Sequence, residues 1–75
     1  MRVDVYGLFE LDVVRRERGW VVYRVRDGRR EAMPELTPPK SLKADELPQW
    51  LDDLLHEHAR PGTTIRIVRG SVQER

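Results

Sequence analysis

Apolar and polar residues alternate along the start of the chain. Three acidic residues stand between five apolar residues at odd positions: Val3, Val5, Phe9, Leu11 and Val13. A period of two is the signal of a strand with one buried face. Gly7 interrupts this run without shifting its phase, so the pattern predicts one strand with a bend at Gly7.

A second segment rich in β-branched and aromatic residues, residues 20–26, is followed by the dipeptide Asp27-Gly28. Asp-Gly favours a two-residue hairpin turn, because both central residues of a type I′ turn need a positive φ. The first connection is expected to be a three-residue loop at residues 17–19, in which Gly19 takes the left-handed conformation. Both connections are therefore expected to join antiparallel strands.

The two turns together determine which residues face each other. Asp12 is expected opposite Arg24, and Arg24 opposite Glu31 on the next strand. Opposite charges directly across a strand pair stabilise it by roughly 0.2–1 kcal/mol each. The third strand ends at Pro34, because proline cannot donate a hydrogen bond to a ladder. The pattern thus predicts an antiparallel three-stranded meander with a ladder of charges across it.

A helical pattern follows the meander. Six residues recur at helical spacing and form one apolar stripe: Leu47, Trp50, Leu51, Leu54, Leu55 and His58. Pro48 is compatible with the first turn of a helix, and Pro61-Gly62 ends it. Residues 63–68 have the composition of a short last strand.

These elements predict an α+β domain with the order β-β-β-α-β. One amphipathic helix would cover one face of the meander. The last strand is expected at an edge of the sheet, parallel to its neighbour and reached by a right-handed crossover. A single domain is expected over residues 1–69, followed by a tail without fixed structure over residues 70–75.

The composition restricts the class of protein. The chain has 75 residues, enough for one domain, and it has no cysteine, which excludes disulfides and cysteine-based zinc sites. Its start lacks the basic and apolar regions of a signal peptide. The longest apolar run, residues 20–23, is far shorter than the roughly 20 residues of a membrane-spanning helix. A cytoplasmic location is therefore expected.

Charge is nearly balanced overall but segregated along the chain. Residues 15–30 hold seven arginines and two acids, whereas residues 45–57 hold five acids and no Lys or Arg. The basic hairpins of residues 15–30 support one interpretation, a regulator that binds nucleic acid. Against it, Arg24 and Arg26 are expected opposite acidic residues, and the two basic turns would lie at opposite ends of a strand.

Acids and histidines gather at the end of the helix, in residues 52–58. His56 and His58 are two residues apart, about 200° around a helix, so they lack the i, i+4 spacing of a helical zinc motif. Asp52, Asp53 and His56 would share a face, but a solvated helix end is the simpler interpretation. The two serines fall in expected loops with no base beside them. We therefore expect no catalytic, metal or cofactor site, and no enzymatic activity.

The face of the meander opposite the helix is expected to stay open. Five residues are expected to form a candidate interface on it, with the guanidinium group over the indole ring: Val14, Trp20, Val22, Met33 and Arg16. Apolar surface with Trp and Arg is typical of protein interfaces. Two alternatives stay open: scattered apolar residues on a sheet are ordinary, and the proline-rich connection of residues 36–42 could fold over them. The leading hypothesis is a non-catalytic module that pairs with itself or with a protein partner through this face or a strand edge.

Three segments carry a resemblance to a known family: MRVDVYGLFELDVV, GWVVYRV and LPQWLDDLLHEHA. Together they resemble a family of short bacterial proteins of uncharacterised function and about this length. The resemblance implies a bacterial source and no assigned activity, so no functional residues carry over. The order of elements also resembles HicB-type antitoxins, although their proline-glycine motif after the second strand is missing here. This second likeness makes an antitoxin-like regulator part of the nucleic-acid alternative.

Overall fold

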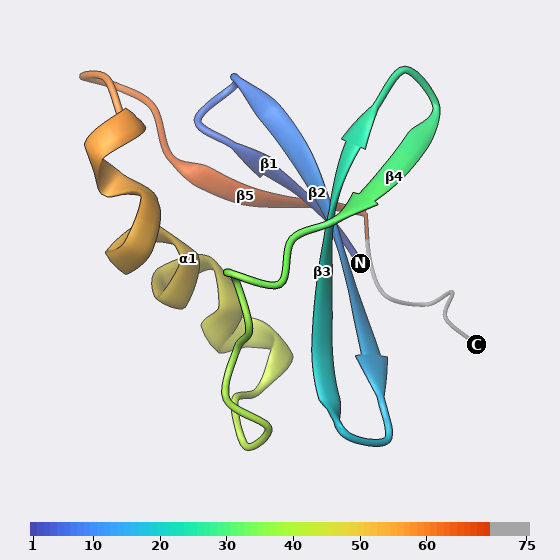
Figure 1. Ribbon diagram of the computed structural model, residues 1–75. Helices are drawn as coiled ribbons and strands as arrows, with labels where there is room; N and C mark the ends of the chain where they lie inside the picture. The colour runs from blue at the N-terminus through green and yellow to red at the C-terminus, as the bar shows by residue number, and fades with distance from the viewer. Residues whose placement is uncertain (70–75) are drawn as a thin grey trace.

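A five-stranded antiparallel sheet with one helix on one side forms the domain (Figure 1). The computed structural model describes residues 1–69, so the tail expected over residues 70–75 lies outside the described residues. The strand order in the sheet is β4-β3-β2-β1-β5. The elements are β1 Arg2–Val5, β2 Phe9–Arg16, β3 Gly19–Arg26, β4 Arg29–Ala32, the 3-10 turn η1 Ala44–Glu46, α1 Leu47–Leu55, the 3-10 turn η2 His56–His58 and β5 Ile65–Arg69. The expected α+β class is confirmed.

The first expected strand is a hairpin of two strands. Tyr6 and Gly7 both have positive φ angles, 55° and 74°, and reverse the chain between β1 and β2. The Leu8 amide donates to the Val5 carbonyl at 2.9 Å, and the Gly7 amide donates to an Asp4 carboxylate oxygen at 3.0 Å. Val5 then pairs with Phe9, so the odd residues of both strands stay on the same face. A single bent strand and this hairpin therefore give the same alternation of apolar and polar residues, and the sequence pattern does not distinguish them.

The last strand is antiparallel to its neighbour, so the expected parallel arrangement is wrong. β5 pairs with β1, with Val3 opposite Ile67 and Val5 opposite Ile65. β5 runs in the same direction as β2, but the extra strand β1 lies between them. A reversal of the chain at Tyr6 and Gly7 thus explains the correction.

The register between β2 and β3 differs from the expected one by one residue. Arg16 pairs with Gly19 across a two-residue turn, and Asp12 lies opposite Tyr23 instead of Arg24. The first step of the expected charge ladder, Asp12 opposite Arg24, is therefore wrong. The register between β3 and β4 is as expected, with Arg24 opposite Glu31.

The hydrophobic core lies between one face of the sheet and a second layer. That layer consists of α1, which buries Leu47 and Leu51, and the proline-rich segment of residues 33–43, which buries Leu36. The buried apolar residues of the described chain are Val3, Val5, Tyr6, Leu11, Val13, Val22, Leu36, Leu47 and Leu51. Leu54 and His58, two members of the expected apolar stripe, are exposed.

Candidate protein-interaction surface

The face of the sheet turned away from α1 has an apolar centre. Antiparallel pairing places Val14 opposite Val21, and Tyr23 lies opposite Ala32 on the next strand, with Val25 beside it. The side chains of Val14, Val21, Tyr23 and Val25 are half-buried, and α1 lies on the other side of the sheet (Figure 1). We call the surface around these residues the open face.

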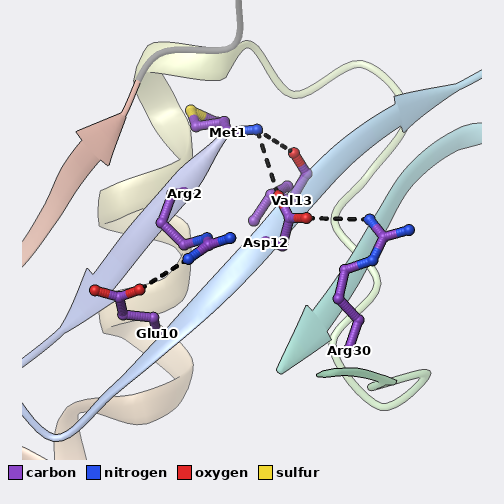
Figure 2. A network of polar contacts seen from close by, with 6 residues as sticks. All are labelled: Met1, Arg2, Glu10, Asp12, Val13 and Arg30. Carbon is purple, nitrogen blue, oxygen red and sulfur yellow. Dashed lines mark hydrogen bonds and ion pairs between the residues drawn. The ribbon is translucent and has the colours of Figure 1, made fainter. Parts of the chain in front are cut away.

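Ion pairs lie on the same face of the sheet as these apolar residues (Figure 2). The Arg2 guanidinium donates to Glu10 Oε1 at 3.0 Å, and the Arg30 guanidinium donates to Asp12 Oδ2 at 3.0 Å. The amine of Met1 lies 3.7 Å from the other Asp12 oxygen and donates to the Val13 carbonyl at 2.9 Å. These acidic and basic groups therefore pair with one another, and both signs of charge lie beside the apolar residues of the open face.

The five residues of the expected interface do not share one face, so that grouping is wrong. Val14 and Arg16 lie on the open face, but the one-residue change of register turns Trp20, Val22 and Met33 toward the core. Val22 is 1% exposed. The alternative that the proline-rich segment covers these residues is confirmed for Trp20, whose indole N–H donates to the carbonyl of Leu42 at 2.9 Å.

The arginines of the basic hairpins are partly used within the domain. The Arg15 guanidinium lies 4.6 Å from the centre of the Trp20 ring, a place that the sequence assigned to Arg16. Arg24 stacks on Phe9 at 4.7 Å, and Arg30 stacks on Tyr23 at 4.3 Å. Such contacts fix the guanidinium groups over aromatic faces and stabilise by roughly 0.5–1 kcal/mol at exposed sites.

The acids and histidines of the helix end do not converge. Asp52 accepts a hydrogen bond from the Tyr6 hydroxyl, and Asp53 accepts one from Gln49 at 2.9 Å. His56 Nδ1 lies 3.3 Å from the main-chain oxygen of Asp53 instead of a carboxylate. Within residues 1–69, no group of three or more His, Cys, Asp or Glu side chains is arranged to hold a metal ion.

The contact between Tyr6 and Asp52 is a feature that the sequence reasoning missed. Tyr6 sits in the turn between β1 and β2, yet its side chain is only 4% exposed and reaches α1. Burial of the phenol, together with the hydrogen bond and the negative charge of Asp52, raises the pKa of Tyr6 to about 12. A tyrosine followed by a glycine inside an alternating run is the sequence signal that could have marked this turn.

A hollow of about 370 Å³ lies beside the first half of β3. Its apolar walls come from Trp20, Val21, Val22, Met33 and Leu36, and the exposed Arg16 and Arg18 side chains also line it. It lies at the boundary between β3, the end of β4 and the proline-rich segment. We call it the edge hollow.

Comparison with known proteins identifies the family but no activity. A family model described as "Domain of unknown function (DUF7661)" matches residues 1–69. The chain belongs to this family. DUF7661 thus covers every described strand and the helix, and the resemblance to a family of uncharacterised function is confirmed. No curated protein and no solved structure matches the chain. In the part of the chain that the structure describes, α1 and the 3-10 turns are all too short or too polar to cross a membrane.

Proposed function

We propose that this domain is a non-catalytic protein-interaction module whose open face packs against a protein surface, in the first instance that of a second copy. The observation that supports the proposal is the row of Val14, Val21, Tyr23 and Val25 on the face of the sheet turned away from α1. A sheet with one covered face stabilises itself further by burying the other, at about 25 cal/mol per Å² of apolar area.

The charges of the open face support pairing with a second copy. In a two-fold interface the same patch lies on both sides, so it has to be complementary to itself. The face carries Arg2 and Arg30 beside Glu10 and Asp12. In a two-fold pair, the basic groups of one copy can therefore meet the carboxylates of the other. A cytoplasmic setting is part of this proposal and rests on the lack of cysteine.

Replacing Val14 by glutamate is expected to abolish self-association, because it places a charge in the apolar centre of the face. The wild-type solution mass should rise with concentration from 8.9 kDa toward twice that value. The Val14→Glu variant should stay monomeric at the concentrations at which the wild type pairs, because its affinity is at least about tenfold weaker. Analytical ultracentrifugation over a range of concentrations measures both.

Leu54→Glu is the matched control, because Leu54 is 50% exposed on α1 and lies on the other side of the sheet. It should associate like the wild type. A wild type that remains a monomer at every concentration would exclude pairing with a second copy. A different protein partner of the open face would then be sought, with the Val14→Glu variant as the negative control.

A nucleic-acid-binding, antitoxin-like regulator is the second candidate. It is favoured by the exposed Arg16 and Arg18 at the turn between β2 and β3, with Lys40 packed against Gly19 nearby. This candidate predicts that a labelled single-stranded oligonucleotide binds at low salt, and that each released counterion lowers affinity as salt rises. Fluorescence anisotropy with the wild type and Arg18→Glu tests it. Anisotropy that stays flat at low salt would eliminate this candidate.

A further inference from the structure

The strand β3 is paired with β4 along only half of its length. β4 pairs with residues 23–26 of β3, and the part of β3 nearest the turn with β2 extends beyond it (Figure 1). The Met33 amide still donates to the Val22 carbonyl at 2.9 Å, and Pro34 then follows as the chain leaves the sheet. Residues 19–21 of β3 therefore form an edge with no neighbouring strand on the β4 side, although β3 is an inner strand of the sheet.

The main-chain groups of Trp20 point out of this edge. Met1 and Val13 exchange hydrogen bonds, so the odd residues of β2 point toward β1 and the even residues toward β3. Trp20 lies opposite Arg15, an odd residue, and its N–H and C=O are therefore directed away from β2. Among residues 1–69, the main chain of Trp20 has no hydrogen-bonding partner on that side.

The edge hollow lies beside these free groups and has a single sign of charge. Its lining combines apolar walls with the exposed arginines Arg16 and Arg18 and contains no acidic residue. A main-chain donor and acceptor on an open strand edge bind an extended backbone, and a neighbouring pocket selects its alternate side chains. Arginines at the rim favour carboxylates on that backbone.

We propose that the edge hollow binds a short, extended, acidic segment of a partner protein by β-strand addition. The segment runs antiparallel to β3, in line with β4, and exchanges two hydrogen bonds with the main chain of Trp20. One apolar side chain enters the hollow, and the residues on either side of it place carboxylates near Arg16 and Arg18. The edge hollow borders the open face at Val21, but the segment is held by the main chain of Trp20, so this site goes beyond the pairing proposed above.

Titration with a defined pentapeptide tests this site. The probe is acetyl-Glu-Val-Glu-Val-Glu-amide, and the readout is the amide resonance of Trp20 in a nitrogen-15 correlation spectrum at low salt. We expect a saturable shift of the Trp20 amide and slower exchange of its proton with solvent. The Arg18→Glu variant should bind roughly fivefold more weakly or worse.

Arg29→Glu is the matched control, since Arg29 is an exposed arginine at the turn between β3 and β4, at the far end of β3. It should bind the probe like the wild type. The same peptide with N-methylated central amides should fail to bind, because it cannot complete the ladder.

Three results would overturn the proposal. They are a Trp20 amide that does not move at about 1 mM peptide, equal binding of the lysine analogue acetyl-Lys-Val-Lys-Val-Lys-amide, and shifts confined to Val14, Tyr23 and Val25, which do not line the hollow. Self-association is measured without peptide, so failure here leaves the pairing of two copies unaffected, and failure of that pairing leaves this site unaffected.

Discussion

Replacing Leu51 by alanine is expected to lower the free energy of unfolding by about 2–4 kcal/mol. Leu51 is fully buried between α1 and the sheet, so the substitution removes apolar contacts and leaves a cavity in a thin core. Domains have a total stability of roughly 0.05–0.15 kcal/mol per residue, so this loss is a large share of what a chain of 75 residues has. Urea denaturation followed by circular dichroism measures the change.

Leu54→Ala is the matched control on the same helix. The substitution is chemically identical, but Leu54 is 50% exposed, and the expected loss is below about 1 kcal/mol. Equal losses for the two variants would mean that α1 packs on the sheet with a different face from the one described.

Alkaline pH is expected to destabilise the domain through Tyr6. The pKa of Tyr6 is raised to about 12 in the folded state, whereas an unfolded tyrosine ionises near its ordinary value of about 10. The folded state therefore holds this proton more tightly, and the stabilisation is fully present below pH 10. It is lost as the pH rises from about 10 to about 12. Urea midpoints at pH 8 and pH 11 measure the loss.

The Tyr6→Phe variant separates this effect from other alkaline transitions. At neutral pH it should lose roughly 1–2 kcal/mol, because Asp52 loses a hydrogen-bond donor and a buried polar contact disappears. Between pH 8 and pH 11 its stability should fall less than that of the wild type. Tyr23→Phe serves as the control, since Tyr23 lies half-buried on the open face, and it should retain the wild-type alkaline loss. A Tyr6→Phe variant that declines as steeply as the wild type would contradict the assignment.

The sequence could predict the parts of the fold that local chemistry determines. Asp27-Gly28 requires positive φ angles, which both residues adopt, and the register between β3 and β4 follows from that turn. The helix start was also predictable, because Pro48 is compatible only with a first turn. In each case one residue type permits a single backbone geometry.

The register between β2 and β3 could not be predicted, because both faces of β3 are apolar. Trp20 and Val22 stand on one face and Val21, Tyr23 and Val25 on the other, so a shift by one residue exchanges two almost equally hydrophobic sets. Val22 is buried in the core that α1 and the proline-rich segment share with the sheet, and alternation along one strand does not encode this long-range packing. The candidate interface was affected by the same ambiguity, and only Val14 and Arg16 remain on the open face.

The turn at Tyr6 and Gly7 has a consequence for the order in which the sheet is assembled. Every neighbouring pair among β1, β2, β3 and β4 is a hairpin, whereas β5 has to meet β1 across almost the whole sequence, with Val3 beside Ile67. Among the strand pairings, the entropic cost of loop closure, which slows the formation of contacts between distant residues, is therefore highest for this one. The strands β1 to β4 can pair through local contacts, whereas the pairing of β5 with β1 joins the two ends of residues 1–69 at one edge of the sheet.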